Sequence, residues 1–174
     1  LGHRTSEWCG HAPILEEDLA LPNIALDLIG HAETLYIMAG EVDVNNRDED
    51  SLAFLRLEHE YKNLLLVEQQ NGHFGNTILR LFYFSTYMKI FWQKLHCFSN
   101  YEKLKRFADQ ANKETSYHAK HAGHWIMRLG DGTEESHYKM MEAIDNLQPF
   151  LGELFLEDSF SQQAYEEKLF PKPK

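Results

Sequence analysis

The sequence has little of what small cross-linked, β-rich or membrane proteins need. Two cysteines among 174 residues, Cys9 and Cys97, are too few for a disulfide framework and lack the spacing of a zinc site. Five prolines and ten glycines leave few turns, and no hairpin punctuation flanks alternating residues. No apolar run approaches the roughly 20 residues of a membrane span. These absences favour an all-α protein with no membrane partner, and we expect both cysteines to be reduced and buried in helices.

Net positive charge is also missing. The formal charge is −10 and the sequence pI is near 5.4, which argues against a nucleic-acid partner because phosphate binding needs a basic surface. Hydrophobic residues make up 43% of the chain, enough for a core without metal or cross-links. Because both cysteines are expected to be reduced, the simplest expectation is a cytoplasmic protein.

What the chain does have is helical periodicity. Along four segments the apolar residues recur in steps of three and four, which places each set on one helix face. The sets are Leu21, Ile24, Leu28, His31, Leu35, Met38; then Phe74, Ile78, Leu81, Ser85, Met88, Trp92, Leu95; then Leu104, Ala108, Ala111, Thr115, His118, Ala122, Trp125, Leu129; then Ser136, Met140, Ala143, Leu147, Phe150, Leu154. Four such helices predict an antiparallel bundle.

Turn signals set the expected boundaries. The helices are predicted over residues 1–11, from the Pro13 region to about 40, and over 49–69, 74–98 and 101–129, with a further one after Thr133. Pro22 predicts either a kink or a fresh helix start. In the turn from Gly130 to Thr133, a left-handed Gly130 or Gly132 is expected, with Thr133 as cap. The chain begins without Met, and we expect the start of the first helix to lie outside it. Residues 1–158 are predicted to form the bundle, and residues 159–174 a tail.

Two histidines lie on the core stripes, and their neighbours suggest a metal site that has lost its ligands. A carboxylate-bridged di-iron bundle takes a glutamate from each of two helices and a Glu-x-x-His from each of the other two. Here the residue three before His31 is Leu28, and the residue three before His118 is Thr115. No Asp or Glu occurs between residues 68 and 102, so the helix over 74–98 cannot donate a carboxylate. Glu7, in the first helix, is the only carboxylate left at a position where a di-iron bundle would have one.

Other arrangements stay open. Asp27 and Glu114 each lie four residues before a histidine, and a non-standard site could combine them with Glu7, His31 and His118. A second group, His121, His124 and His137, accompanies His118, but the first two lie off the core stripe. Hydrogen-bonded core histidines are the interpretation that we favour for His31 and His118.

Several segments resemble the C subunits of phenylacetic acid degradation complexes. They are Ser6-Glu7-Trp8-Cys9-Gly10-His11-Ala12-Pro13, residues 23–32 (NIALDLIGHA), residues 63–69 (NLLLVEQ) with Asn71-Gly72, residues 113–118 (KETSYH) and residues 128–136 (RLGDGTEES). The resemblance covers nearly everything from Gly2 to Phe155.

The resemblance implies a ferritin-like, non-catalytic structural subunit of the monooxygenase that epoxidises the ring of phenylacetyl-CoA. Its implied partner is the di-iron catalytic A subunit, in a homo- or hetero-oligomer. It implies no catalytic residue, cofactor or bound metal in this chain, with Glu7, Leu28, His31, Thr115 and His118 as vestigial site positions. The rival is a metal-binding ferritin-like oxidase with a non-standard site.

The helix over 74–98 carries more aromatic residues than one core can bury. Outside its stripe lie Phe82, Tyr83, Phe84, Tyr87, Ile90 and Phe91. We expect an outer face of this helix to pack on the catalytic subunit or on a second copy of the chain. The alternative is that the segment from Glu49 to Gln69 covers it.

Overall fold

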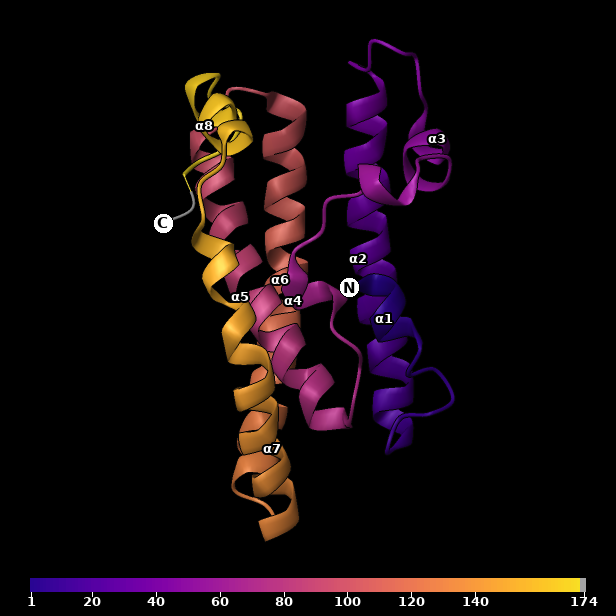
Figure 1. The fold of residues 1–174 in the computed structure, drawn as a ribbon, viewed down its shortest axis with the longest axis vertical. Helices are drawn as coiled ribbons and strands as arrows, with labels where there is room; N and C mark the ends of the chain where they lie inside the picture. Colours follow the sequence, from indigo (N-terminus) through magenta and orange to yellow (C-terminus); the bar gives the residue numbers. More distant parts are fainter. Residues whose placement is uncertain (173–174) are drawn as a thin grey trace. The chain divides into compact units, whose positions relative to one another are not determined.

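The structure is a computed structural model that describes residues 1–172 (Figure 1). Every regular element in that range is helical, which confirms the all-α prediction. The chain divides into two compact units, Leu1–Asn63 and Leu64–Lys174. No helix among the described residues is long and apolar enough to cross a membrane.

The first unit is built around one long helix. It contains α1 (Gly2–Ser6), α2 (Leu15–Gly40), α3 (Glu49–Phe54) and the short 3-10 helix η1 (Glu58–Glu60). Helix α2 begins after the extended Ile14, and its first turn carries three acidic residues that favour the positive helix end. It continues through Pro22, so a fresh start at that residue is wrong. Gly2 lets α1 approach α2 closely, because a Cβ there would lie 3.2 Å from the Ala25 carbonyl oxygen.

The single helix predicted over residues 49–69 is wrong. Helix α3 ends at Phe54, and the chain then passes through η1 to the short α4 (Leu65–Glu68). Arg56 accounts for the break: its Nε donates to the Leu52 carbonyl at 2.6 Å and its Nη2 to the Tyr36 hydroxyl at 2.9 Å, while its guanidinium lies 4.3 Å from the Tyr61 ring centroid. Leu55, just after the end of α3, is exposed.

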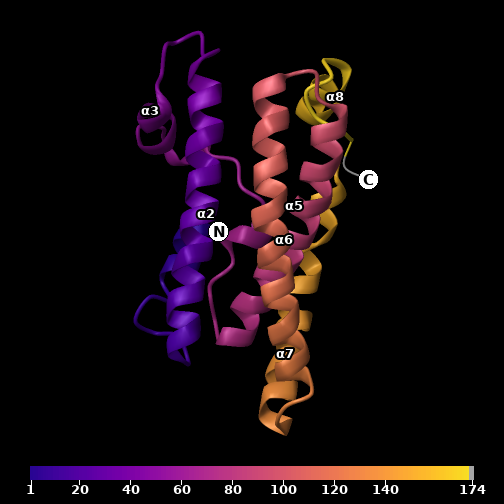
Figure 2. The same ribbon diagram turned by 180° about the vertical axis from the view of Figure 1, so that it is seen from behind.

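The second unit is a set of antiparallel helices with its own core. Helices α5 (Phe74–Phe98) and α6 (Glu102–Gly130) lie side by side, and α7 (Glu134–Leu147) packs on both (Figures 1 and 2). The predicted bounds of α5 are confirmed, and the stripe of α6 is buried from Leu104 to Ala122. The core cluster consists of Leu66, Leu79, Met140, Ala143, Leu147 and Leu154.

The turn between α6 and α7 does not use the left-handed glycine that was predicted. Thr133 caps α7 as expected, accepting from the Ser136 amide at 3.1 Å. Neither Gly130 nor Gly132 is left-handed, because the glycines with positive φ in the described chain are Gly10 and Gly72. Gly132 is required for space instead, since a Cβ there would lie 2.9 Å from the Arg128 carbonyl oxygen.

The C-terminal region contains three further short helices among the described residues. After the 3-10 helices η2 (Gln148–Phe150) and η3 (Gly152–Phe155), helix α8 (Ser159–Glu166) begins at the capping residue Asp158. Its Tyr165 stacks on Phe98 of α5, with ring centroids 5.2 Å apart. Pro173 and Lys174, the end of the expected tail, lie outside the described residues.

The two cysteines differ from the prediction as well. Cys9 lies in the turn after α1 and Cys97 in the last turn of α5, and both are free thiols exposed to solvent rather than buried. Each lies off the apolar face of its segment, which the residue type alone does not reveal.

Candidate functional site

His31 occupies the core side of α2 in the first unit. Its exposed fraction is 9%, and Leu21 and Ile24, on the same face, are fully buried. Leu28, one turn before it, is half-buried and lies beside α1, because a Cβ at Gly2 would contact the Leu28 Cβ at 3.4 Å. The position where a Glu-x-x-His motif needs a carboxylate is thus filled by a hydrocarbon in a helix–helix contact.

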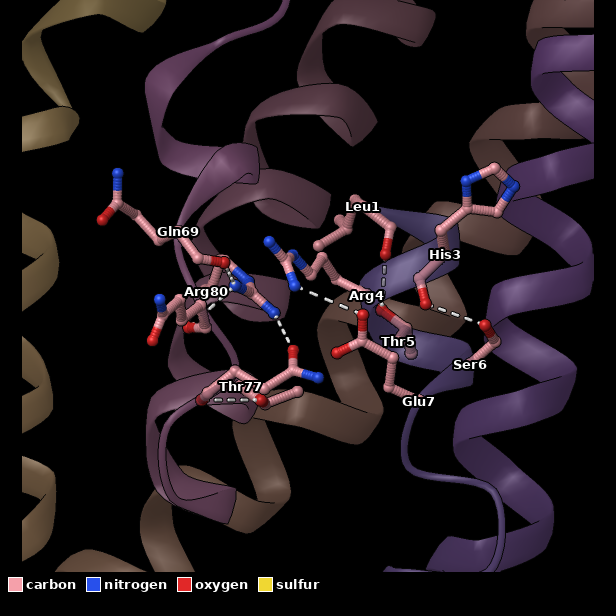
Figure 3. Close-up of polar contacts among 11 residues, drawn as sticks. Leu1, His3, Arg4, Thr5, Ser6, Glu7, Gln69, Thr77 and Arg80 are labelled. Carbon is pink, nitrogen blue, oxygen red and sulfur yellow. Dashed lines mark hydrogen bonds and ion pairs between the residues drawn. The ribbon is translucent and has the colours of Figure 1, made fainter. Parts of the chain in front are cut away.

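Glu7 does not lie in a buried site. It follows α1 as the C-cap residue, its side chain is half exposed, and its Oε1 pairs with Arg4 Nη1 at 3.3 Å (Figure 3). In the same helix the Thr5 hydroxyl donates to the Leu1 carbonyl at 3.1 Å, and Thr5, not Glu7, is the buried residue. The first-helix glutamate is held at the surface by a local ion pair.

His118 and Thr115 are buried in α6 of the second unit, with exposed fractions of 0% and 1%. The Thr115 hydroxyl donates to the carbonyl of Ala111 at 2.7 Å, so its proton is committed to its own helix. Glu114 is half-buried, and its Oε1 accepts from Gln110 Nε2 at 3.0 Å. His31 and His118 are both buried, as their stripe positions predict, and the hydrogen bonds expected of their rings stay a prediction.

These donors do not fit a carboxylate-bridged di-iron centre. Hard iron ions need charged oxygen ligands, and the buried cations need negative charge to balance them. Leu28 supplies no donor atom, Thr115 supplies a neutral hydroxyl, and Glu7 is exposed and paired. Across residues 1–172, no three His, Cys, Asp or Glu side chains are grouped so that they could hold a metal ion.

The remaining histidines of α6 and α7 have separate surroundings. His121 is half-buried, with its ring centroid 6.0 Å from that of Tyr117, and His124 is exposed. His137 Nδ1 lies 2.9 Å from the Gly130 carbonyl oxygen, which can only accept, so this nitrogen carries the proton. His137 thus closes the interhelical turn and takes no part in a histidine cluster.

Comparison with known proteins identifies the family. The family described as phenylacetic acid catabolic protein matches residues 1–174. The chain belongs to this family. It is 42% identical, over all of its 174 residues and 69% of the relative's length, to the C subunit of the 1,2-phenylacetyl-CoA epoxidase of Escherichia coli strain K12.

The sequence prediction missed a buried cation in this family member. Arg80 of α5 is 1% exposed, and its guanidinium donates to the carbonyls of Gln69 and Gln70 and to the side-chain oxygen of Asn71 (Figure 3). Thr77 also fastens this loop, donating to the Asn71 carbonyl at 3.0 Å. The sequence signal that could have revealed this burial was an arginine inside a helix that contains no acidic residue. The helix that lacks a carboxylate ligand thus buries a positive charge.

The outer face of α5, expected to be an interface, is partly covered by the chain itself. Tyr87 meets Phe155 edge-on with ring centroids 5.9 Å apart, and Phe91 stacks on Phe170 at the same centroid distance. The C-terminal segment therefore supplies a cover that neither sequence alternative included.

Proposed function

We propose that this chain is a non-catalytic structural subunit of a cytoplasmic phenylacetyl-CoA epoxidase, in which it pairs with the di-iron catalytic A subunit. The observation that carries the proposal is the 42% identity, along the whole chain, to a protein named as the C subunit of that epoxidase. Family membership supports a role in phenylacetate catabolism.

The donor set supports the non-catalytic part of the proposal. At both Glu-x-x-His positions the carboxylate is replaced, by Leu28 and by Thr115, and α5 has no acidic residue at all. Restoring a di-iron centre would need several substitutions rather than one. The chain's own residues thus favour packing over oxygen chemistry.

A subunit without chemistry can still act through stability. A partner that binds only the folded catalytic subunit stabilises it by mass action, by about 2.7 kcal/mol when its concentration is 100 times the Kd. For a domain of 150–250 residues this raises the melting temperature by about 5–10 °C. The physical role is to hold a bundle that must open for a bulky thioester substrate.

Metal content tests the proposal against the rival oxidase. The protein is purified from iron-supplemented culture and analysed for elements beside the His31→Asn/His118→Asn double variant. We expect iron well below one ion per chain in both proteins. Two irons per wild-type chain, lost in the double variant, would overturn the non-catalytic assignment and support a metal-binding oxidase with a non-standard site.

Co-expression tests the partnership. The chain and the catalytic A subunit are produced together, and the melting temperature of the A subunit is measured alone and with increasing amounts of the chain. We expect co-purification and a rise that depends on concentration. Separate elution, with an unchanged melting temperature, would contradict the structural role.

A further inference from the structure

A groove remains on the outer face of α5 inside the second unit. Its volume is about 310 Å³, at the small end of the roughly 300–1,000 Å³ of ligand pockets. Seven residues of α5 between Phe82 and Lys94 form one wall, spaced so that they share one helix face. Residues of the 151–155 segment and Lys172 form the other wall.

Five of the eleven lining residues are aromatic, and their rings differ in orientation. The planes of Tyr87 and Phe155 are 88° apart, whereas Tyr87 and Phe91 are nearly parallel at 18°. Aromatic rings prefer edge-to-face and offset-stacked neighbours, and both arrangements are offered to an additional ring in this groove. These rings offer an aromatic group stacking and edge contacts that an aliphatic group cannot make.

The charged residues of the groove have one sign. Lys94 and Lys172 line it, and no Asp or Glu does, although the whole chain has 27 acidic and 17 basic residues. Phe170 stacks on Phe91, which brings the segment carrying Lys172 to the end of α5 that carries Lys94. Glu157 lies 3.7 Å from Lys172 Nζ but outside the lining. Lys172 is thus ion-paired outside the groove, and the lining itself, with two lysines and no acidic residue, favours an anionic ligand.

Neutral polar groups in the wall add hydrogen-bonding capacity. Thr86 lines the groove, and its hydroxyl oxygen, which solvent does not reach, has no hydrogen-bond partner within the described chain. The Tyr83 and Tyr87 hydroxyls can donate, because a phenol is protonated at neutral pH at its ordinary pKa and burial raises the pKa of both further. These groups suit an oxygen-bearing ligand.

We propose that this groove binds a small aromatic carboxylate, with its ring between the α5 aromatics and Phe155 and its carboxylate at the lysine end. The proposed site depends only on the groove's shape, charge and hydrogen-bonding groups. It is therefore independent of the partnership with a catalytic subunit and of the metal content of the chain.

Ligand titration tests this site. Phenylacetate, its neutral analogue phenylacetamide and the aliphatic hexanoate are added to the isotope-labelled full chain, and Kd values are obtained from amide chemical shifts. We expect saturable shifts at groove residues, with phenylacetate binding more tightly than both analogues. No saturable shift with phenylacetate, or equal affinity for phenylacetamide, would overturn the proposal.

Two variants locate the carboxylate. Lys94→Met removes one groove charge and should weaken phenylacetate binding about fivefold, the upper range for a partly exposed ion pair. Lys89→Met is the matched control, because it removes the same charge from the same helix outside the groove, and it should leave Kd unchanged. Equal effects of the two variants would show that binding responds to net charge alone, which contradicts the proposed site.

The remaining occupant to test is a second copy of the chain. Ile90 lines the groove and is 47% exposed, so Ile90→Glu should abolish phenylacetate binding while the helix content stays unchanged. A wild-type chain that elutes as a dimer, and becomes monomeric with this variant, would overturn the small-ligand proposal by assigning the groove to self-association.

Discussion

Two glycines in the turn between α6 and α7 should respond in opposite ways to alanine. At Gly132 an added Cβ would lie 2.8 Å from Ser136 Oγ and 2.9 Å from the Arg128 carbonyl oxygen. At Gly130 it would meet nothing within 4 Å. Neither residue has a left-handed backbone. The need for glycine is therefore steric at Gly132 and absent at Gly130.

The magnitude follows from what the Cβ displaces. Ser136 Oγ donates toward the Leu129 carbonyl at 2.7 Å and accepts from the Thr133 amide at 2.9 Å, so moving it disrupts the α7 cap. Overpacking costs about 1–3 kcal/mol and loss of a cap about 1 kcal/mol, against a gain of about 0.4–1 kcal/mol from a stiffer unfolded chain. Gly132→Ala should thus lower the free energy of unfolding by about 2 kcal/mol.

Gly130→Ala lacks the steric cost and should raise the free energy of unfolding by about 0.5 kcal/mol, because alanine is the better helix residue at the end of α6. Thermal unfolding followed by circular dichroism measures both variants. The melting temperature should fall by about 4–8 °C for Gly132→Ala and rise by about 1–2 °C for Gly130→Ala. A loss of stability at Gly130 equal to that at Gly132 would show a left-handed Gly130 and refute this geometry.

Three further predictions concern single polar contacts. The hydrogen bonds from Arg47 lower the pKa of Asp43 to about 2. The contribution of this carboxylate to stability should therefore be complete above about pH 4 and be lost as the pH falls toward 2. A carbon-detected NMR titration with an Asp43 midpoint near 3.8 would contradict this. Glu153 accepts from the amides of Leu65 and Leu66 at 2.9 and 2.7 Å, so Glu153→Ala should cost about 1 kcal/mol in urea unfolding and Glu153→Gln less. His73 is the N-cap of α5, and its Nδ1 accepts from the Asn76 amide at 3.1 Å. His73→Ala should therefore also cost about 1 kcal/mol, whereas His73→Asp should restore the cap. Equal stabilities of the wild type and His73→Ala would show that this cap contributes nothing.

The long helices could be predicted from sequence because one signal dominates each of them. Helix α5 has a regular apolar stripe between the break at Gly72 and the turn at Ser99, and its bounds are as predicted. The stretch over 49–69 also contains apolar residues at helical spacing, yet it breaks. There the guanidinium of Arg56 bonds to Tyr36, twenty residues earlier, and lies over the Tyr61 ring. Contacts between side chains distant in sequence leave no periodic trace.

In the candidate site, too, periodicity predicts some features and contacts between distant residues determine others. Periodicity places His31 and His118 in the core, because one apolar face is enough to fix their orientation. It does not place Glu7, whose exposure depends on where α1 ends and on its pairing with Arg4. Nor does it reveal that Arg80 is buried, since that position is stable only because carbonyls of the 69–71 loop accept from its guanidinium.

The aromatic excess of α5 is explained by two surfaces on one helix. Its stripe from Ile78 to Leu95 fills the core with α6. The face from Phe82 to Phe91 is only half-buried. The C-terminal segment covers it in part, with the Phe155 ring in the groove wall and the Phe170 ring stacked on Phe91. This cover is too small for the face that it meets, so a groove remains, with Lys94 and Lys172 in its lining. The same residues that exceed the needs of one core therefore supply the walls of a binding groove.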